Sequence, residues 1–548
     1  MADKMRHAHR LVVTSGLFIA AAVIGATGCD HVVDDCALAH TCPSSATAGG
    51  GGDGAGTGGG GAGMGGGGAS VSCDPTTSPD LNGVDASCGV YVWSNAFVVP
   101  YLGTNTSPYK TLAAALTDVA GRTNPKLRNV YACNEGTFTE PVALSDGVTL
   151  WGGLNCDNLT WNYDKDSKTA LTALAGAIPL TVSGTVDVTV HDFAITAAPA
   201  TPSGGSSIAV VVDSATATFT RCDLSAGDAK DGASGVNGGV PAPQAASGKQ
   251  GDNAGAKNAR GGSGGTNTCD TNDPAVPADL AGGPGGGGGS VIGGGGGKGG
   301  QGDIDKGGVG GNGGSSNLSC SNGQEGSGST TPVNGLAGLG IGVINASGYH
   351  GTDGTDGTNG THGTSGGGGG GTMASSIPGA AGGGGGAGGC GGKLGTKGEA
   401  GGSSIALMGL KATVTMNACT LSAGKGGNGG AGGDGQPGQQ GGNGGIGGTG
   451  SAPVLLGCDG GKGGKGCDGG NGGGGSGGHS LGIAMVDGML TSTMPLSAFQ
   501  PTVSGDGGLG GNMNVSGNKG TKGLAVWCWD FDGTQDGKAC TPSNKPPS

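Results

Sequence analysis

The chain of 548 residues offers few side chains whose type and spacing could carry out a reaction. Hydrolysis of a glycosidic bond needs two carboxylates that flank the bond, and a polysaccharide lyase needs a cation or a basic side chain beside a groove. His191 and Asp192 are adjacent in the sequence, so on a strand their side chains point to opposite faces. We therefore predict no catalytic residue, and we interpret the following candidates as turn or outward-facing residues: His191, Asp192, Asp213, Arg221, Asp223, and Asp157 near Trp161.

Aspartates that precede glycine are the next candidates, as metal ligands. They are Asp353, Asp356, Asp434, Asp459 and Asp468. The calcium-binding nonapeptide, with Gly-Gly-x-Gly-x-Asp in register with a following apolar residue, is not repeated, and no EF-hand loop occurs. No Gly-Lys-Ser/Thr closes a phosphate-binding loop. We therefore predict no metal and no cofactor, and we interpret these aspartates as solvated side chains.

The N-terminus has the three parts of an export signal. Three basic residues precede an apolar run over residues 11–28, which ends in Ala26-Thr27-Gly28-Cys29. This segment resembles a bacterial lipoprotein signal, in which the cysteine after two small residues receives diacylglycerol on its sulfur before the chain is cut ahead of it. The resemblance implies lipidation of Cys29, although Ala26 stands where that family usually has leucine. The alternative is an ordinary secretory signal cut near Gly28.

Sixteen cysteines in an exported chain favour disulfides over metal sites, because histidine is scarce and no Cys/His ligand spacing occurs. Lipidation of Cys29 would leave an odd number, so at least one thiol would be free or bonded to another molecule. The connectivity stays open at this point. The nearby pairs that we consider are Cys133 with Cys156, Cys458 with Cys467, and Cys528 with Cys540.

Charge and glycine content narrow the class of protein further. The formal net charge is −13, and removal of a basic signal makes it more negative. Nucleic-acid binding needs clustered Lys and Arg, so we expect no nucleic-acid partner. Glycine makes up 139 residues, about a quarter of the chain against a usual share of about 7%. Such a chain cannot bury one large ordinary core, so its packing must be concentrated in part of the sequence.

One short helix is expected ahead of the apolar segments. Ser107-Pro108 supplies a capping hydroxyl and a proline at the first helical position. Leu112, Ala115, Leu116 and Val119 then follow at helical spacing, and Gly121 supplies a stop. The pattern predicts a helix over residues 108–120.

After this helix the apolar period changes to two, which is typical of short strands. The alternating sets are Val142/Leu144, Val148/Leu150, Leu180/Val182, Val186/Val188/Val190, Ile208/Val210/Val212 and Ala215/Ala217/Phe219. A repeat accompanies them: Ser206-Ser207-Ile208-Ala209 with Cys222-Asp223-Leu224-Ser225-Ala226-Gly227 recurs as Ser403-Ser404-Ile405-Ala406 with Cys419-Thr420-Leu421-Ser422-Ala423-Gly424. The segment that starts at His479 is a third, looser copy. Repeated coils of short strands predict an all-β solenoid, best a right-handed parallel β-helix whose open end the helix caps.

A resemblance supports this fold. Ser107-Pro108-Tyr109-Lys110-Thr111-Leu112, Val130-Tyr131-Ala132-Cys133, and Gly147-Val148-Thr149-Leu150-Trp151-Gly152-Gly153 look like the opening of bacterial pectin-lyase-like β-helix proteins. The chain is also similar to glycine-rich lipoproteins labelled "PGRS family" in myxobacteria. The resemblance covers residues 88–225 well and implies the fold and its cap, without any catalytic residue.

The glycine segments have a strict period of three. Every third residue is glycine from Gly426 to Gly450 and from Gly457 to Gly478, and again within 351–369 and 383–401. This period matches an extended left-handed helix with three residues per turn, whose all-glycine edge lets backbones approach closely. Proline is too rare for collagen, so the pattern favours a bundle of polyglycine-II-like segments. The alternative, from composition alone, is disorder.

These observations give a complete hypothesis for organisation and role. The expected parts are a signal peptide (1–28), a flexible tether (29–70), an N-terminal cap (71–128), β-helix coils (129–227), a glycine-rich insertion (228–402), a coil (403–424), a second insertion (425–478), the last coils (479–526) and a C-terminal tail (527–548). We expect a lipid-anchored envelope protein, at the outer membrane or cell surface, with a structural or adhesive rather than enzymatic role. Its partners would be the membrane and possible surface polysaccharides or other cells. The alternative is a carbohydrate-binding β-helix, a polysaccharide lyase or a glycosidase.

Overall fold

The computed structural model describes residues 73–77, 86–269, 279–289, 302, 307–314, 319–328, 331–374, 377–450, 456–493, 499–500, 502–512, 518–532 and 536–540. Cys29, the expected signal peptide (1–28) and the expected tether (29–70) therefore lie outside the described residues. In the described part, no helix has both the length and the apolar character needed to cross a membrane.

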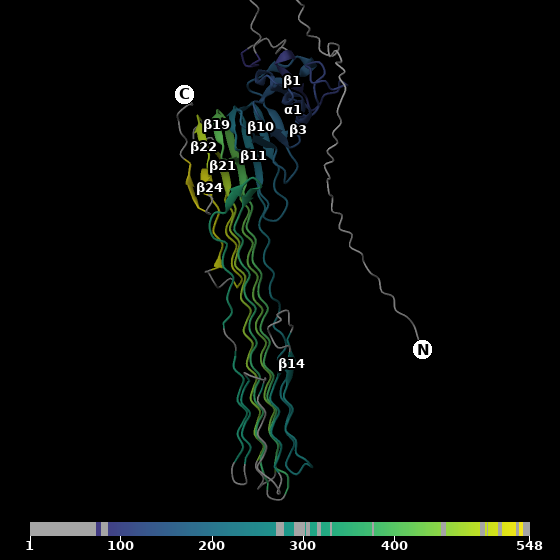
Figure 1. The fold of residues 1–548 in the computed structure, drawn as a ribbon, viewed down its shortest axis with the longest axis vertical. Helices are drawn as coiled ribbons and strands as arrows, with labels where there is room; N and C mark the ends of the chain where they lie inside the picture. The colour runs from purple at the N-terminus through teal and green to yellow at the C-terminus, as the bar shows by residue number, and fades with distance from the viewer. Residues whose placement is uncertain are drawn as a thin grey trace, which may run out of the picture. The chain divides into compact units, whose positions relative to one another are not determined.

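The fold is all-β, with most of its strands in three sheets that are largely parallel (Figure 1). Sheet 1 contains, in spatial order, β1 (Gly89–Val92), β2 (Asn129–Cys133), β5 (Thr149–Asn155), β9 (Val188–His191), β12 (Thr216–Thr220), β19 (Thr413–Asn417) and β22 (Met489–Ser492). Sheet 2 contains β23 (Phe499–Gln500), β20 (Thr420–Ala423), β13 (Asp223–Ala226), β10 (Phe193–Ala197), β7 (Thr169–Thr172) and β3 (Thr137–Thr139). Sheet 3 contains β25 (Gly537–Ala539), β24 (Ala525–Phe531), β21 (Ser480–Val486), β18 (Ser404–Leu410), β11 (Ser207–Asp213), β8 (Leu180–Ser183) and β4 (Val142–Leu144).

Smaller elements complete the fold. β6 (Asn162–Tyr163) pairs antiparallel with β5, and β25 pairs antiparallel with β24. Two further antiparallel pairs are β14 (Thr266–Thr268) with β15 (Asp279–Ala281), and β16 (Val343–Asn345) with β17 (Gly348–His350). Short 3₁₀ turns span Ala86–Cys88, Pro125–Leu127 and Asp157–Leu159.

The chain fills the three sheets in a fixed order. Successive strands enter sheet 3, then sheet 1, then sheet 2: β8, β9 and β10, then β11, β12 and β13, then β18, β19 and β20. The sequence repeat sets the register between these groups, because Ile208 lies opposite Ile405 and Leu224 lies opposite Leu421. The third copy continues the stack, with Leu481 opposite Ile405. Equivalent residues of the repeat are therefore direct neighbours in the sheets.

The core lies between the three sheets. Inward residues of β9, β10 and β12, among them Val190, Phe193 and Phe219, are buried in one apolar cluster. In sheet 3 the strands β11, β18 and β21 are buried on both faces. The hairpin β16–β17 places Ile344 and Tyr349 in a second cluster, with Ile405 and Met408 of β18. The alternating set Ile208/Val210/Val212 located β11, but alternation does not reveal burial of both faces, since a strand buried on both faces is apolar throughout.

The predicted helix is present but begins later than the sequence pattern indicated. α1 spans Leu112–Ala120, and its N-cap is Thr111, whose side chain accepts from the N–H of Ala114. The Glu140 carboxylate accepts from the N–H groups of Leu112 and Ala113 at 2.8 and 3.2 Å, so it satisfies two more donors of the first turn. The prediction of a start at residue 108 was wrong because Thr111, and not Ser107, is the N-cap, and because Glu140, distant in the sequence, satisfies two further donors.

Two predicted boundaries also differ from the structure. β1 lies inside the segment assigned to the N-terminal cap (71–128), so the parallel sheets begin earlier than expected. β24 crosses the boundary at residue 527, and with β25 it makes the expected tail part of sheet 3.

One residue of the alternating sets lies outside a strand. Val186 was expected in a strand, but its side chain is 45% exposed and it precedes β9.

Candidate functional site

Long glycine-rich segments leave the sheets at one corner of the fold. They connect β13 with β18, β20 with β21, and β23 with β24, which means that each one follows a strand of sheet 2 and precedes a strand of sheet 3. Figure 1 shows them running side by side away from the sheets as extended chains. Because the strands that they connect are stacked neighbours, the segments start next to one another. We call these extended segments arms and name each by its residues.

Backbone hydrogen bonds join the arms. Every third N–H of the 426–448 arm, from Gly427 to Gly448, donates to a carbonyl of the 379–402 arm at 2.7 to 2.9 Å. Every third N–H of the 456–478 arm donates in turn to the 426–448 arm at 2.8 to 3.0 Å. The 379–402 arm completes the set of three, since every third N–H from Gly383 to Gly401 donates to the 456–478 arm at 2.8 to 3.0 Å. The arms therefore form a lattice in which one arm bonds to several neighbours, unlike a strand in a flat sheet.

Glycine is required wherever an arm lies so close to a neighbour that no Cβ atom fits between them. A Cβ atom on Gly384 would lie 2.1 Å from the carbonyl oxygen of Ser263, and one on Gly385 or Gly386 would lie 2.0 Å from that of Gly366 or Gly442. Three consecutive residues thus face three different arms. The continuous run Gly382–Gly386 is fully buried, whereas outer arms keep glycine only at every third residue. The local glycine pattern therefore reflects how many neighbours an arm has.

Polar side chains accept from some of the N–H groups that do not bond to a backbone carbonyl of a neighbouring arm. In the 351–374 arm, five successive third residues each accept from the 379–402 arm at 2.7 to 2.9 Å. These acceptors are Asp353, Asp356, Asn359, His362 and Ser365, and their donors are the N–H groups of Ala400, Lys397, Leu394, Gly391 and Gly388. Asp434, Asp459 and Asp468 accept in the same way from Asn512, Gly447 and Gly438. The interpretation of these aspartates as merely solvated was wrong, because each one bonds a neighbouring arm.

The lattice is interrupted at one level. The 228–254 arm donates to the 426–448 arm from Gly232, Gly235 and Gly238 at 2.7 to 2.8 Å. The next donor in this series would be Pro241, which has no N–H. The arm bends at Gly239, whose φ is +114°, and regular bonding resumes at Ala245 with the register shifted by one residue.

Two glutamines fill the gap that this bend leaves. Gln436 and Gln439 interrupt the glycines on the face of the 426–448 arm that meets the bend, and their amide nitrogens donate to the carbonyls of Val240 and Pro243. Beside them lies a cavity of about 580 Å³, which we call the waist groove. Its lining comprises Val236, Asn237, Gly238, Ala242, Asn267, Thr268, Cys269, Asn359, Gly360, His362, Cys390–Leu394, Thr396, Gln436, Pro437 and Gln439.

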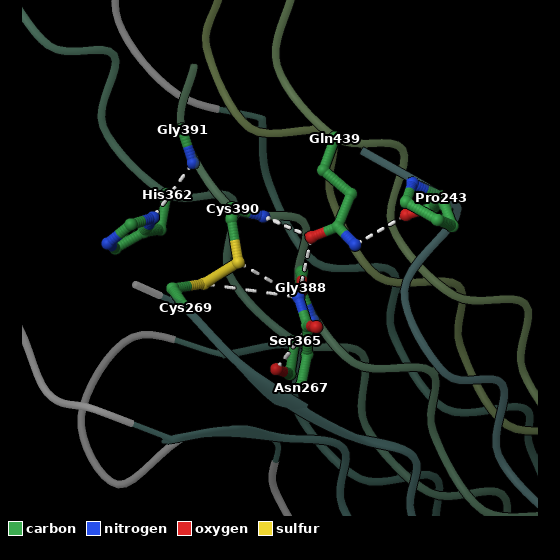
Figure 2. Close-up of a disulfide and its surroundings, with 9 residues drawn as sticks. All are labelled: Pro243, Asn267, Cys269, His362, Ser365, Gly388, Cys390, Gly391 and Gln439. Carbon is green, nitrogen blue, oxygen red and sulfur yellow. Dashed lines mark hydrogen bonds between the residues drawn. A yellow bond between two sulfur atoms is a disulfide. The ribbon is translucent and has the colours of Figure 1, made fainter. Parts of the chain in front are cut away.

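Cys269 and Cys390, which both line this groove, form a disulfide (Figure 2). The side-chain oxygen Oε1 of Gln439 accepts from the Cys390 N–H and from the Asn267 side-chain NH₂ group at 2.9 and 2.8 Å. His362 lies on the other side of the disulfide in Figure 2, where its Nδ1 accepts from the Gly391 N–H at 2.8 Å. The two sulfurs and a ring nitrogen of His362 lie within 4.8 Å of one another, a donor set that suits soft metals. Here both sulfurs are bonded to each other and Nδ1 holds a backbone N–H, so these groups tie arms together.

The catalytic candidates around His191 are engaged in structural contacts. Asp192 is fully buried at a corner between β9 and β10, and its carboxylate accepts from Arg221 Nε and Nη2 at 2.7 and 2.8 Å and from the Tyr163 hydroxyl at 3.0 Å. The His191 ring stacks on Trp151 with a centroid distance of 4.0 Å. Burial and the positive charge of Arg221 lower the pKa of His191 to about 4.

The remaining residues that were considered as catalytic candidates make other contacts. Asp223 pairs with Lys168 at 2.5 Å, and Asp213 accepts from the Ser214 hydroxyl. The backbone carbonyl of Asp157 accepts from the hydroxyl of Thr160 within a short 3₁₀ turn. Trp161 is 4% exposed and donates to the carbonyl of Asn105. None of these contacts brings a second carboxylate to the His191 cluster.

Two of the three disulfide pairs expected from the sequence are present, Cys133 with Cys156 and Cys528 with Cys540. The third was wrong: Cys458 is bonded to Cys320, and Cys467 is a free thiol. Three turns of extended chain separate Cys458 from Cys467, while the lattice brings the distant Cys320 beside Cys458. Cys73 with Cys88 and Cys269 with Cys390 complete the disulfides of the described residues.

The groove residues were missed by the sequence analysis, although a signal exists. Glycine recurs at 427, 430 and 433 and again at 442, 445 and 448, with Gln436 and Gln439 in the two places between. Searches against protein-family models, curated proteins and solved structures gave no match. The function must therefore be argued from the chain itself.

Proposed function

We propose that the mature chain is a non-enzymatic protein of the bacterial cell envelope, anchored by lipid on Cys29, with a structural or adhesive role. The export signal and Cys29 support the location, and the glycine lattice supports the role. We also propose, as part of this function, that the chain is related to the glycine-rich lipoproteins labelled "PGRS family". The membrane would be the partner at the N-terminus, with surface polysaccharide or other cells as possible partners of the arms and no nucleic acid.

We infer that the three sheets are the faces of a right-handed parallel β-helix. The cyclic order of sheets 3, 1 and 2 along the chain supports this inference. So do the corners between sheets 1 and 2, where Asp192, Arg221 and Ala418 follow one another in successive coils with φ values of 55°, 54° and 51°. A stack of coils grows by adding turns, and insertions at one corner then lie side by side.

The arms fit a polyglycine-II-like bundle, and this is the observation that carries the proposal. Each arm bonds its neighbours through every third N–H, as a helix with three residues per turn allows. At about 3.1 Å per residue, an arm of 24 residues would extend roughly 75 Å. Such a bundle lacks a large apolar core and takes its stiffness from backbone bonds, which suits a projection that holds a surface away from the membrane.

The alternative from the sequence is a β-helix that binds or cleaves carbohydrate. One observation favours carbohydrate binding over cleavage: the waist groove between the arms is lined in part by polar side chains, among them Asn237, Asn359 and Thr396. Turnover of an acidic polysaccharide by the purified chain would favour the enzyme instead and would overturn the non-enzymatic proposal.

Limited proteolysis and small-angle X-ray scattering of the mature chain test the projection. We expect the 425–478 region to resist a protease that cuts unfolded chains, and the scattering to require a particle far longer than a globule of equal mass. Rapid cleavage within this region together with a flexible-chain scattering profile would reject the rigid bundle. A Cys29→Ala variant tests the anchor separately, because it should no longer fractionate with membranes.

A further inference from the structure

Asparagine followed by glycine recurs along the arms, and the two residues of such a step can react with each other. The backbone nitrogen of the glycine attacks the side-chain carbon Cγ of the asparagine. The new N–Cγ bond replaces the bond from Cγ to the amide nitrogen, which leaves as ammonia with the proton of the glycine N–H. Water then opens the resulting succinimide ring to aspartate or isoaspartate. The described residues contain eight such steps, at Asn237, Asn312, Asn322, Asn334, Asn359, Asn428, Asn443 and Asn471.

Six of the eight steps are held by neighbouring arms through both reacting groups. The side-chain oxygen of the asparagine accepts from a backbone N–H of a neighbouring arm at 2.8 to 3.0 Å. The N–H of the following glycine donates to a backbone carbonyl of a neighbouring arm at 2.7 to 2.9 Å. Attack requires the side chain and the glycine nitrogen to turn toward each other, so it would break both bonds. These held steps are at Asn237, Asn322, Asn334, Asn359, Asn428 and Asn471.

The steps at Asn443 and Asn312 are open by comparison. Within the described ranges, the N–H groups of Gly444 and Gly313 contact no acceptor. The side-chain oxygen of Asn443 lies 3.5 Å from the amide nitrogen of Gln244, which exceeds the usual length of a hydrogen bond. Both asparagines are exposed, so water can reach each step.

A lysine explains why the Gly444 N–H is open. N–H groups on this edge of the 426–448 arm donate to side chains of the antiparallel 456–478 arm at 2.8 Å, in the pairs Gly435 with Asn471, Gly438 with Asp468, and Gly447 with Asp459. In the same register Lys462 stands opposite Gly444, and Lys465 stands opposite Gly441. An ammonium group donates hydrogen bonds but cannot accept one, so these two N–H groups are left without the acceptor that their neighbours have.

We infer that Asn443 and Asn312 are sites of spontaneous deamidation in the folded chain, and that the lattice protects the six held steps. Attack at Asn443 requires one backbone bond to open, the bond from the Gly248 N–H to the Asn443 carbonyl oxygen at 2.9 Å. A held step requires both of its own bonds to open, which is a rarer local fluctuation. The inference does not depend on the location or the role of the chain.

The product at Asn443 has a consequence for the bundle. In isoaspartate the main chain passes through the side-chain carbons, so the arm gains one backbone atom between Asn443 and Gly444. This atom interrupts the three-residue turn just before Gly445 and Gly448, whose N–H groups donate to the 379–402 arm at 2.7 Å. The far end of the 426–448 arm should therefore lose its register with the 379–402 arm as the protein ages.

The test is incubation of the folded mature chain in detergent at mildly alkaline pH, followed by digestion with an acid-active protease and mass spectrometry of the peptides. We expect Asn443 and Asn312 to lose their amides at least about tenfold faster than any held asparagine. Isoaspartate should be among the products, because the succinimide route forms it and direct hydrolysis of the amide does not. In the denatured chain all eight steps should react at comparable rates.

A matched pair of variants tests the cause. Lys462→Asp places a carboxylate opposite the Gly444 N–H, as Asp459 and Asp468 already do for their partners, and should slow the loss at Asn443 by about tenfold. Lys465→Asp makes the same change of charge one turn away, opposite Gly441, and should leave the rate at Asn443 within about twofold of the original.

The held asparagines in each sample report whether the fold is intact, because unfolding would accelerate them all. Equal rates at Asn443 and at the held asparagines of the folded chain would overturn the inference. Products without isoaspartate, or equal effects of the two lysine variants on Asn443, would also overturn it.

Discussion

Asp192 lies between β9 and β10, and Arg221 lies between β12 and β13, the equivalent place in the next pair of strands. The guanidinium of Arg221 donates two hydrogen bonds to the carboxylate of Asp192, at 2.7 and 2.8 Å. The Asp192 side chain has no solvent exposure, and the Arg221 side chain is 34% exposed. Tyr163 donates a third bond to the same carboxylate. A buried carboxylate is tolerated when charge and donors surround it, so this pair links the β9–β10 connection to the β12–β13 connection.

Removal of Arg221 should destabilise the sheets strongly. Arg221→Ala leaves Asp192 buried without its counter-ion, and we expect the free energy of unfolding to fall by about 3 kcal/mol. Urea denaturation followed by tryptophan fluorescence measures this change. Lys165→Ala is the control, because Lys165 pairs with Asp166 on the exposed surface and should change stability by less than about 0.5 kcal/mol. Equal stability of the two variants would show that the corner pair contributes nothing.

Acid should destabilise the fold through His479. This ring is fully buried, its Nε2 bonds the Ile341 carbonyl at 2.6 Å, and its Nδ1 accepts from the Leu524 N–H at 2.8 Å. Burial lowers the pKa of His479 from 6.5 to about 4. The unfolded chain therefore binds a proton below about pH 6.5 that the folded chain refuses until about pH 4.

The free energy of unfolding therefore has its full value, as far as His479 is concerned, above pH 6.5. It declines as the pH falls toward 4, by an amount on the order of 3 kcal/mol. His191, whose pKa is also lowered to about 4 by burial, acts in the same direction. Urea midpoints measured at intervals from pH 7 to pH 4.5 test the slope. His479→Gln can keep both hydrogen bonds but cannot titrate, so its slope should be smaller. An unchanged slope would exclude His479 as a source.

The sheets were predictable from the sequence because their register follows the repeat. Ile208 and Ile405 occupy equivalent places in two copies, and stacking of like on like puts them opposite each other. The start of α1 was only partly predictable, since its N-cap Thr111 is local but Glu140, which accepts from two more N–H groups of the first turn, is distant in the sequence. The burial of the outer face of sheet 3 was not predictable for a related reason. The β16–β17 hairpin that covers this face comes from within the longest glycine-rich segment.

The lattice was predictable in form but not in detail. A glycine period of three indicates an extended arm. The glycine edges of different arms are chemically alike, so the sequence does not say which arms are neighbours. Cys458 illustrates this: only the lattice shows that Cys320, and not Cys467, lies beside it. The waist groove depends on Pro241 facing Gln436 and Gln439 across two arms, a correspondence that no local pattern contains.

Thiol labelling should separate the three free cysteines of the described residues. Cys222 and Cys419 are buried, whereas Cys467 is partly exposed, and burial raises the pKa of the Cys222 thiol. Iodoacetamide at neutral pH should therefore modify Cys467 in the folded chain, and Cys222 and Cys419 after denaturation. Peptide mapping without reduction should recover Cys320 linked to Cys458. A peptide that links Cys458 to Cys467 would contradict the lattice as described.

A single methyl group should distinguish lattice glycines from tolerant ones. Gly385→Ala would place a Cβ 2.0 Å from the Gly366 carbonyl oxygen, a backbone atom that cannot move without displacing its arm. Gly328→Ala is the matched control, because its nearest neighbour would be the Lys465 carbonyl oxygen at an ordinary 3.6 Å. Overpacking typically costs about 1 to 3 kcal/mol.

Hydrogen exchange can locate the effect of Gly385→Ala. The Gly386 N–H donates to the Gly461 carbonyl at 2.9 Å in the interior of the bundle, so its exchange reports local opening there. We expect Gly385→Ala to accelerate this exchange by about tenfold or more and Gly328→Ala to leave it unchanged. The core of the sheets should stay protected in both variants, because the arms leave the sheets at a corner. Slow exchange at Gly386 in Gly385→Ala would mean that the arms are not packed at the distances on which the lattice depends.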